Sequence, residues 1–281
     1  MHQHFKENRL RGNPAYPFVL YEMPQEDNAL CAAMHWQDDV EVLCITRGSV
    51  ELTLDGSQQI LHADDMICIN PGQLHAFRAH SADAQCAIFI FPIQHLLFVV
   101  DDHDQQHYLR QLADGHLGFP LRLHTDCHPY QLIKQMIDLQ KRRPVAYEML
   151  TKALLLQMIA HLAQQDAFVP LQSARHNDVC KQILLYIQQH YSEKITVQDI
   201  AKAVAISPTY FSAFFARHFF CRFSDYLRNF WIEQACAMLT GTNTSVTEIA
   251  LSVGFNSASH LVEQFRKTKN VTPRTYRNAR R

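Results

Sequence analysis

The 281-residue chain lacks the cysteine pairs and the long hydrophobic runs that mark several common protein classes. Its eight cysteines include no CxxC pair, so we expect buried free thiols in a reducing cytosol rather than disulfides or a zinc site. The most apolar stretch, residues 86–100, is short and is interrupted at Pro92, Gln94 and His95, which excludes a bilayer span. The first residues form no apolar segment, so we expect no secretory signal, no membrane partner and a cytoplasmic location.

Signatures of catalysis and an overall charge excess are also missing. No GxSxG, HExxH or P-loop motif occurs, so we expect no enzyme. The net charge is −1, but residues 175–281 contain 14 Lys and Arg against 7 Asp and Glu, whereas residues 1–174 contain 12 against 20. This asymmetry indicates a nucleic acid-binding C-terminal half joined to an N-terminal half with another role.

The C-terminal half contains the same helix-turn-helix pattern twice, at residues 196–217 and 245–267. The directly matching apolar pairs are Val197 and Val246, Ile200 and Ile249, Ala201 and Ala250, Val204 and Val253, and Ile206 and Phe255. One extra residue after the second turn then pairs Phe211 with Leu261 and Phe215 with Phe265. Two copies with matching cores predict that this half binds double-stranded DNA with two groove-reading helices.

Signals for helix ends support this pattern. Thr196 with Asp199 predicts an N-cap, and Ser207-Pro208 predicts the start of the first recognition helix. We also predict a helix from Asn177 or Asp178 to His190, one long helix over residues 223–239 between the copies, and a short helix after Thr272-Pro273. Gly254, and less comfortably Ala205, is expected to adopt the left-handed conformation between the paired helices.

The outer faces of the recognition helices carry the candidate DNA contacts. We expect four aromatic residues to face the core at least in part: Tyr210, Phe211, Phe214 and Phe215. The remaining outer residues are Thr209, Ser212, Ala213 and Arg217 in the first copy, and Ser257, Ser259, His260, Glu263, Arg266 and Lys267 in the second. The candidate phosphate contacts are Arg217, Arg222, Arg228, Arg266, Lys267 and Lys269. Adjacent major grooves on one DNA face lie about 34 Å apart, so one chain would cover about two helical turns.

Residues 16–95 predict short strands separated by turns. The strands fall at residues 40–46, 49–54, 66–69 and 86–91, and the turns at Gly48, Gly56 and Asn70-Pro71-Gly72. This pattern favours a compact antiparallel β-barrel, and the whole chain is therefore of the α+β class. We predict domain boundaries at residues 1–100 for the barrel, 101–168 for a helical coupling region, 169–177 for a linker and 178–281 for the DNA-binding domain.

Three helices are predicted in the coupling region, at residues 108–112, 126–141 and 145–164. The third repeats Met149, Ala153, Leu156, Ile159, Ala160 and Ala163 at helical spacing, while Leu154 and Leu155 widen its apolar face. One interpretation is a two-sided helix that packs on the barrel and on a second chain, giving a homodimer. The other is that both faces lie in the core of this chain.

Residues 35–75 resemble the cupin barrel. That barrel often carries a His-x-His with a downstream Glu and a later His at its mouth, and His35, Glu41 and His75 match those positions. Gln37 stands where the second His would be. We interpret the four residues as the lining of an effector pocket with no metal and no cofactor. The alternative is a divalent transition metal, which imidazole and carboxylate ligands suit, and with it a metal-dependent cupin enzyme carrying a DNA-binding tail.

Residues 178–278 resemble the DNA-binding domain of the AraC/XylS family of bacterial transcription regulators. The matching residues are Ser207-Pro208-x-Tyr210-Phe211, Phe223-x-x-Tyr226-Leu227, Ile232-Glu233-x-Ala235, Leu239, residues 245–250 and 253–257, Phe265-Arg266-Lys267 and Thr272-Pro273-x-x-Tyr276-Arg277. The resemblance implies a cytoplasmic regulator, often a dimer and often an activator that contacts RNA polymerase. The N-terminal half is similar to the effector domains of family members that sense sugars and metabolites, so it implies a small-molecule effector.

Several residues depart from the family pattern. Ala213 and Glu263 replace arginines on the two outer faces, and Trp231 replaces a basic residue. Ala213 is limited to contact with a thymine methyl, whereas Glu263 accepts from cytosine N4. Phe220 and Asn270 replace the glycines that end the recognition helices, and only Asn270 is expected to tolerate a left-handed turn. A further alternative is therefore a regulator with weakened DNA affinity that acts through partner proteins.

Overall fold

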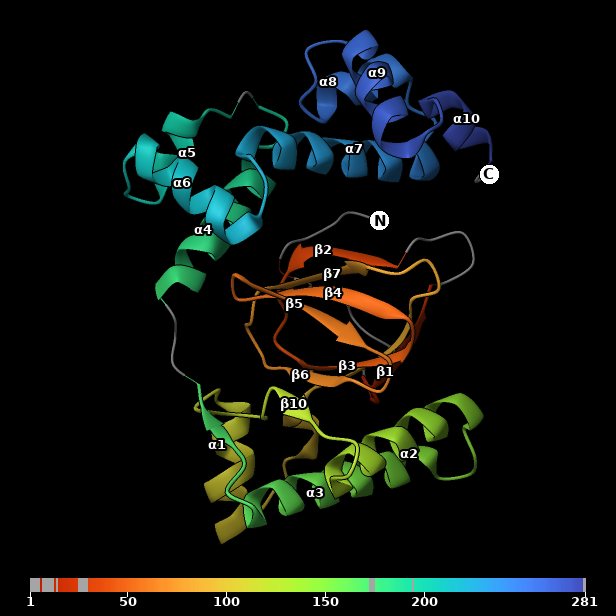
Figure 1. Ribbon diagram of the computed structural model, residues 1–281, viewed down its shortest axis with the longest axis vertical. Coiled ribbons are helices and arrows are strands. Elements are labelled where there is room, and N and C mark those ends of the chain that lie inside the picture. The colour runs from red at the N-terminus through yellow and green to blue at the C-terminus, as the bar shows by residue number, and fades with distance from the viewer. Residues whose placement is uncertain are drawn as a thin grey trace. The chain divides into compact units, whose positions relative to one another are not determined.

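The computed structural model describes residues 6, 13, 15–24, 30–171, 175–193 and 195–279, with the backbone alone at 175–177. The chain divides into two compact units (Figure 1), Asn8–Ala174 and Arg175–Arg281, the second of which also takes in Met1–Glu7. Across the described residues, no helix is both long and apolar enough to pass through a membrane.

The N-terminal unit is built from antiparallel strands in two sheets. The five-stranded sheet runs β1 (Val19–Met23), β8 (Gln85–Phe91), β3 (Val40–Arg47), β6 (Met66–Ile69) and β10 (Arg122–Leu123). The four-stranded sheet runs β2 (Cys31–His35), β7 (His75–Ala79), β4 (Ser49–Leu54) and β5 (Ser57–His62). Two short strands, β9 (Leu117–Gly118) and β11 (Val169–Pro170), pair separately. The prediction of an α+β chain with an antiparallel N-terminal β domain is confirmed.

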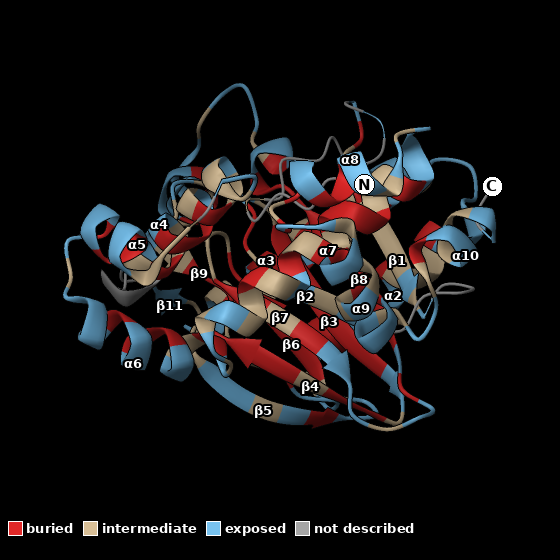
Figure 2. Cartoon of the chain, turned by 90° about the horizontal axis from the view of Figure 1, so that it is seen from above, coloured by how far each residue is buried: buried red, intermediate tan, exposed pale blue. Residues whose placement is uncertain are grey.

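Strand β3 is buried on both faces. Successive side chains along a strand point to opposite sides of the sheet, so the strand contributes to two cores. Val42 and Cys44 belong to the core beneath the helices, whereas Leu43 and Ile45 belong to the core between the two sheets. Figure 2 shows β3, β4 and β6 buried along most of their length, while β5 is largely exposed. Glu41 lies two residues before Leu43 on the same strand, so its side chain points to the same face, the one that meets the other sheet.

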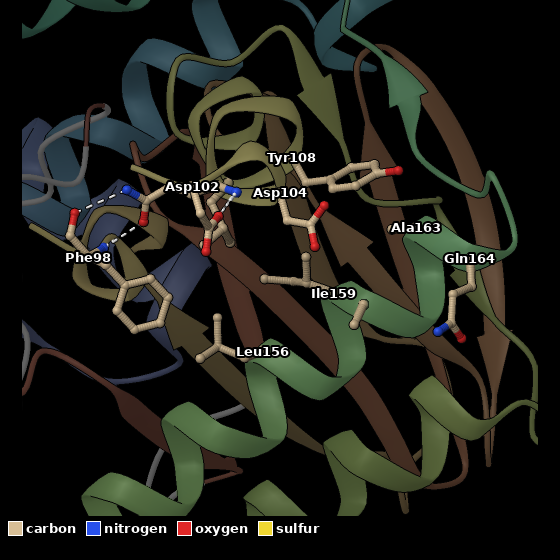
Figure 3. A pocket seen from close by; sticks show the side chains of 11 residues that line it. Phe98, Asp102, Asp104, Tyr108, Leu156, Ile159, Ala163 and Gln164 are labelled. Atoms are coloured by element: carbon tan, nitrogen blue, oxygen red, sulfur yellow. Dashed lines mark hydrogen bonds between the residues drawn. The ribbon is translucent and has the colours of Figure 1, made fainter. Parts of the chain in front are cut away.

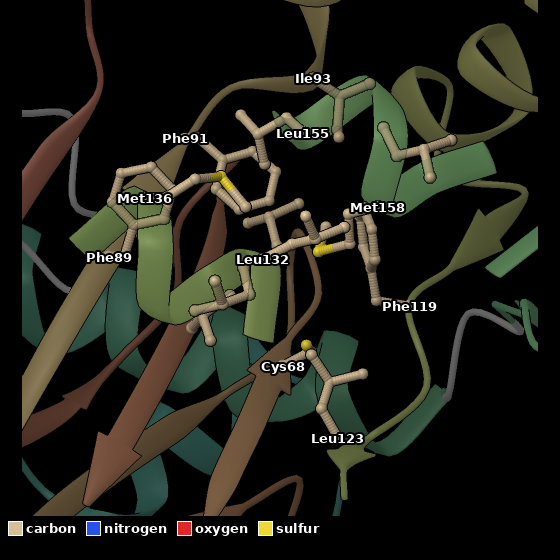
Figure 4. Close-up of a cluster of buried hydrophobic side chains, with 14 of the residues drawn as sticks. Cys68, Phe89, Phe91, Ile93, Phe119, Leu123, Leu132, Met136, Leu155 and Met158 are labelled. Atoms are coloured by element: carbon tan, nitrogen blue, oxygen red, sulfur yellow. The ribbon is translucent and has the colours of Figure 1, made fainter. Parts of the chain in front are cut away.

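Helices cover the outer face of the five-stranded sheet. They are the 3-10 helix η1 (Ile93–Leu96), the π-helix η2 (Gln105–Leu109), α1 (Arg110–Ala113), α2 (His128–Arg142) and α3 (Tyr147–Gln164). Figure 4 shows Leu132 and Met136 of α2 and Leu155 and Met158 of α3 packed against Phe89 and Phe91 of β8. The predicted helices are thus present, within a few residues of their expected ends.

The apolar residues whose helical spacing predicted α3 form a stripe along this helix, and most of that stripe is exposed. Met149 is 73% exposed, Ala153 and Ala160 are exposed, and Leu156 and Ala163 are half-buried, so only Ile159 of the stripe is in the core. The core face is instead formed by Thr151, Leu155, Met158, Ile159 and Leu162. The interpretation that both apolar faces lie in the core of this chain is therefore wrong, because helical periodicity does not say which of two apolar faces is covered.

All eight cysteines are free thiols. The expectation that they are buried holds for Cys44, Cys68, Cys86, Cys180 and Cys236, but Cys31 is exposed and Cys127 and Cys221 are half-buried. Burial raises the pKa of Cys68 to about 12 and that of Cys44 still further. These thiols therefore stay protonated and pack as small apolar groups.

The C-terminal unit is helical, and its two helix-turn-helix copies match in length. Its helices are α4 (Arg175–His190), α5 (Val197–Ala203), α6 (Pro208–Phe219), α7 (Phe223–Gly241), α8 (Val246–Ser252), α9 (Ala258–Lys269) and α10 (Pro273–Asn278). Both α5 and α8 have seven residues, and both α6 and α9 have twelve. The connecting turns span residues 204–207 and 253–257. The extra residue, which was expected after the second turn, therefore lies within it.

The predicted caps of α5 and α6 are present, and α8 has a capping box that was not predicted. Thr196 and Asp199 form a capping box at α5, and Ser245 and Glu248 form the equivalent box at α8. The hydroxyl of Ser207 accepts from the Tyr210 amide at the start of α6. These reciprocal bonds satisfy backbone donors that a helix start leaves without partners.

Left-handed residues end the helices in both copies. Ala205 (φ 56°) and Gly254 (φ 106°) occupy the two turns, as predicted. Phe220 (φ 55°) and Asn270 (φ 58°) follow the recognition helices, so the expectation that Phe220 would not adopt this conformation is wrong. A left-handed residue that is not glycine costs roughly 1–2 kcal/mol, and Phe220 adopts this conformation while 43% exposed.

Tyr210 faces the core only in part, because it is 53% exposed. Phe211, Phe214 and Phe215 are buried as predicted. Tyr210 lies in the first turn of α6 with its ring 5.9 Å from that of Phe214, at the edge of the core. A phenol at such an edge keeps its hydroxyl in water.

Helix α7 joins the two copies. At its first turn Phe223 and Tyr226 pack edge-on against Phe215, and towards its other end Ile232, Ala235, Cys236 and Leu239 join the core of the second copy with Ile249, Ala250 and Phe265. Figure 1 shows α5 and α6 at one end of α7, and α8 and α9 at the other. One continuous helix therefore sets the distance between the two recognition helices.

Gly254 is a residue that the second turn requires. A Cβ atom built there would lie 2.5 Å from both Trp231 Nε1 and the Tyr191 carbonyl oxygen. We predict that Gly254→Ala lowers the free energy of unfolding of the C-terminal unit by more than about 1 kcal/mol, because the clash adds to the left-handed strain. Thermal unfolding followed by far-UV circular dichroism measures this change.

The matched control is Gly241→Ala, where an added Cβ meets nothing within 4 Å. Because Gly241 ends a helix, alanine there should leave the melting temperature unchanged or raise it slightly. Equal melting temperatures for the two variants would contradict the role given to Gly254.

Candidate DNA-binding surface and effector site

The structure exposes all the predicted outer-face residues of the two recognition helices. In the first copy these are Thr209, Ser212, Ala213 and Arg217, and in the second Ser257, Ser259, His260, Glu263, Arg266 and Lys267. The opposite faces bury Phe211 and Phe215 in α6, and Leu261 and Phe265 in α9. Each recognition helix therefore presents a polar face to solvent over an apolar face that anchors it.

The first recognition face carries little charge. Arg217 is its single charged side chain, and the Ser212 hydroxyl donates to the Pro208 carbonyl within the same helix. Ala213 contributes only a methyl group. Such a face suits apolar contact with a thymine methyl and one phosphate or guanine contact through Arg217.

The second recognition face contains an ion pair. Lys267 Nζ lies 2.6 Å from Glu263 Oε1, one helical turn away. The hydrogen bond from Lys267 and the charge of its ammonium lower the pKa of Glu263, which therefore stays ionised at neutral pH. Lys267 is thus engaged by a carboxylate on the face that sequence reasoning assigned to DNA, and Arg266 is the adjacent cation outside this pair.

The predicted phosphate contacts fall into two groups. Lys269 pairs with Glu233 of α7 at 2.6 Å, and Arg228 pairs with Asp225 at 3.1 Å. Arg217, Arg222 and Arg266 are exposed and form no ion pair within the described residues 195–279. Counting charges along the sequence did not separate these groups. Lys267 finds its partner one turn away on the same helix, and Lys269 finds its partner on α7.

Trp231 has a structural role. Its indole Nε1 donates to the Tyr191 carbonyl at 2.8 Å, and its ring lies edge-on to Phe255 at 5.3 Å. This contact ties the end of α4 to α7 and to the second turn. Trp231 therefore replaces a basic residue of the family pattern without adding a cation to the surface.

The predicted effector residues meet between the two sheets of the N-terminal unit. Glu41 lies on β3, while His35 and His75 are register partners on β2 and β7. The register shifts between Ala32 and His35: three residues of β2 span two of β7, from Phe77 to His75. The extra residue of this β-bulge turns the following side chains of β2 to the opposite face. His35 therefore lies on the same side of the sheet as His75.

Hydrogen bonds fix the side chains of this cluster. The Nδ1 atoms of His35 and His75 lie 2.7 Å and 3.0 Å from the carbonyls of Ala33 and Gln73. Gln37 Nε2 donates to Glu41 Oε2 at 2.9 Å, and His75 Nε2 lies 3.5 Å from the same oxygen. Gln37, Glu41 and His75 are buried, and His35 is half-buried. The structure thus brings all four predicted effector residues together.

A second cavity was not predicted from the sequence. A pocket of about 440 Å³ lies between the π-helix η2 and α3. Figure 3 shows Phe98, Asp102, Asp104 and Tyr108 on one side of it, and Leu156, Ile159, Ala163 and Gln164 of α3 on the other. Its lining includes Leu156, Ala160 and Ala163 of the α3 stripe. Helical periodicity alone gives no signal for a cavity at that place.

Comparison with known proteins agrees with this organisation. Residues 200–279 match a model of a helix-turn-helix domain, and residues 25–159 match a model of the AraC-like ligand binding domain. The uncharacterized HTH-type transcriptional regulator YdeC of Bacillus subtilis is 25% identical over 252 residues, which cover 87% of this chain and 85% of that protein. The uncharacterized HTH-type regulator YdiP of Escherichia coli is 24% identical, covering 85% and 78%.

A crystal structure of an AraC-type transcriptional regulator from Chromobacterium violaceum is 25% identical, with a TM-score of 0.36 over 37% of this chain and 92% of that chain. The matched domains and the whole-length relatives identify the chain as a DNA-binding transcriptional regulator. It belongs to the AraC family and combines an AraC-like ligand-binding domain with the family's helix-turn-helix domain. Its relatives are transcriptional regulators and not enzymes, so the interpretation of a cupin enzyme with a DNA-binding tail is not retained.

The Glu263–Lys267 pair generates a prediction about DNA affinity. Glu263→Gln removes a negative charge from the recognition face and frees Lys267, so non-specific affinity at low salt should rise. If Lys267 then neutralises one more phosphate, the slope of log K against log salt concentration should steepen by about 0.9. Fluorescence anisotropy with a labelled random-sequence duplex measures both quantities.

Glu193→Gln is the control, because Glu193 is exposed, lies outside the recognition helices and also pairs with a neighbouring side chain, His190. It removes the same charge at a position off the recognition faces. A change in slope equal to that of Glu263→Gln would mean that the effect is bulk charge and not the recognition face.

Proposed function

We propose that the protein is a cytoplasmic regulator that responds to a small-molecule effector, a sugar or related metabolite, and activates transcription through contact with RNA polymerase. The effector binds at His35, Gln37, Glu41 and His75. The helical region at residues 101–168 couples this site to the DNA-binding domain, which begins with α4 at Arg175 and not after a linker over the whole of residues 169–177. The observation that carries the proposal is the convergence of these four side chains between the sheets of a ligand-binding domain.

We also propose that α6 and α9 enter successive major grooves. Arg217 and Arg266 are exposed on the two outer faces and hold no ion pair within the described residues 195–279, so they are the cations best placed for phosphate or guanine. Thr209, Ser212, Ala213, Ser257, Ser259 and His260 supply the short contacts around them. Lys267 acts as a weaker contact because Glu263 competes with DNA for its ammonium.

A homodimer is part of the same proposal. The exposed stripe of α3 runs Met149, Ala153, Leu156, Ala160 and Ala163, at alternating intervals of four and three residues. This is the seam spacing of helices that pack along their length, and its alanines permit a close approach. A second copy that presents the same stripe would make a closed two-fold contact, which covers the exposed Met149 and Leu150.

The DNA-binding proposal predicts distinct effects for the two arginines. Arg217→Ala and Arg266→Ala should each weaken binding to duplexes selected from a random pool, and should flatten the salt slope by about 0.9 if the side chain contacts phosphate. If it reads guanine, sequence preference should instead relax by about 1–3 kcal/mol at one position. Lys134→Ala in the ligand-binding unit is the control and should change neither. Failure of the wild-type protein to retain any duplex at low salt would overturn the proposal.

The dimer proposal predicts the effect of charge in the α3 seam. Ala153→Glu and Ala160→Glu should convert a dimer into a monomer at micromolar concentration, because each buries a carboxylate against an apolar surface. Gln135→Glu, at an exposed position of α2, adds the same charge outside the seam and should leave the dimer intact. Sedimentation velocity gives the oligomeric state, and a wild-type protein that is monomeric at tens of micromolar would contradict this interface.

A further inference from the structure

We infer that the pocket between η2 and α3 is a second ligand site, which takes a small organic cation with an apolar or aromatic body. The pocket lies in the N-terminal unit, on the helix-covered side of the five-stranded sheet. The proposed effector residues lie on the other side of that sheet, between the two sheets. A ligand in this pocket is therefore an input separate from the effector of the proposed function.

The pocket has the size and the lining of a small-molecule site. Its volume is about 440 Å³, and such sites occupy roughly 300–1,000 Å³. Leu156, Ile159 and Ala160 of α3 form an apolar floor, while Phe98 and Tyr108 supply two aromatic rings on the opposite wall (Figure 3). An apolar floor beneath aromatic rings suits the hydrocarbon part of a ligand.

The polar side of the pocket is acidic. Asp102 and Asp104 lie between the two aromatic rings, and among the eleven described residues that line the pocket none is Lys, Arg or His. Asp102 Oδ1 accepts from the Gln105 amide at 2.8 Å, which fixes that carboxylate, and Asp104 Oδ1 lies 3.3 Å from the Nδ1 atom of the exposed His103. Carboxylates beside aromatic faces attract an ammonium group through charge and through cation–π contact. The same lining repels an anion.

Hydrogen bonds hold the acidic wall in place. Gln105 is 1% exposed, its side-chain oxygen accepts from the Phe98 amide at 2.6 Å, and its Nε2 atom donates to the Phe98 carbonyl at 3.0 Å. Arg110 donates two hydrogen bonds of 2.9 Å to Asp101, so this neighbouring cation is engaged by a carboxylate that does not line the pocket. A wall that is already ordered lowers the entropy cost of binding a ligand.

The backbone of this wall is irregular. The element η2 is a five-residue π-helix, and it contributes Gln105, Tyr108 and Leu109 to the lining. Turns of π-helix are rare in folded proteins and occur frequently at functional sites. This backbone feature is independent of the volume and the charge of the pocket, and it marks the same place.

The pocket also overlaps the proposed dimer seam. Leu156, Ala160 and Ala163 line the pocket and belong to the exposed stripe of α3. A ligand whose body covers these side chains competes with a second copy of the chain, because both need the same apolar surface. Binding of the cation therefore favours the monomer, a consequence that rests on the proposed homodimer.

The test titrates the full-length protein by calorimetry with three probes that share an indole ring. Tryptamine is a cation at neutral pH, indole-3-acetate is an anion and tryptophol is neutral. We expect one tryptamine per chain with a Kd below about 1 mM, as ordinary ligand efficiency gives for a molecule of this size. Indole-3-acetate should bind at least about tenfold more weakly, because attraction to the carboxylates and the rings is replaced by repulsion.

The double variant Asp102→Asn/Asp104→Asn removes the charge of the wall and keeps its shape. It should bring the affinities for tryptamine and indole-3-acetate to within about twofold of each other. It should bind tryptophol as the wild type does, which shows that the pocket is intact. Asp126→Asn, at an exposed position outside the lining, is the matched control and should keep the preference for the cation.

Three results would overturn the site. They are no saturable binding of tryptamine at millimolar concentration, equal affinity of the wild type for tryptamine and indole-3-acetate, and the same change of preference in Asp126→Asn as in the double variant. A double variant that still prefers the cation would also contradict the role of Asp102 and Asp104.

Sedimentation velocity tests the competition with the dimer. Saturating tryptamine should shift the wild type from dimer towards monomer. Ala153→Glu, altered in the stripe but outside the pocket lining, should bind tryptamine at least as tightly as the wild type does. A wild-type dimer that persists with saturating tryptamine refutes the competition. A wild type that is monomeric without any probe refutes the proposed homodimer, and calorimetry alone then decides the site.

Discussion

The packing of both helix-turn-helix copies against the single helix α7 is the constraint on which the DNA-binding unit depends. Phe223 and Tyr226 in its first turn hold the first copy, and Ile232, Ala235 and Leu239 hold the second. Nineteen residues in one helix span roughly 28 Å. Both helix-turn-helix copies are therefore fixed to one helix, and neither shifts without breaking a buried contact.

Burial of both faces of β3 plays a comparable part in the ligand-binding unit. The strand contributes Val42 and Cys44 to one core and Leu43 and Ile45 to the other, so it cannot slide or turn without emptying both. Glu41 belongs to this same strand and is thereby held between the sheets. A carboxylate kept inside by the packing of its neighbours is a strong reason to assign function to the cluster around it.

The sequence predicted what depends on local pattern. The repeat located both helix-turn-helix copies and their one-residue difference, and capping signals located the starts of α5, α6 and α10, because buried apolar spacing and caps are local properties. It did not predict that the α3 stripe is exposed, that Phe220 adopts a left-handed conformation, or that Lys267 pairs with Glu263. The exposure of the stripe depends on tertiary contacts. The Glu263–Lys267 pair has i, i+4 spacing, which is readable in the sequence, and it was missed there. His35, Gln37, Glu41 and His75 were identified by resemblance, but the bulge that brings His35 to His75 has no signal in composition or periodicity.

The central claim is that one chain reads two successive major grooves at a spacing fixed by α7. Hydroxyl-radical footprinting on a selected duplex tests it most directly. The account predicts two protected patches on one face of the DNA, separated by about 10–10.5 base pairs, and loss of one patch when about 5 base pairs are inserted between them. A single protected patch, or two patches that both persist after the insertion, would contradict it.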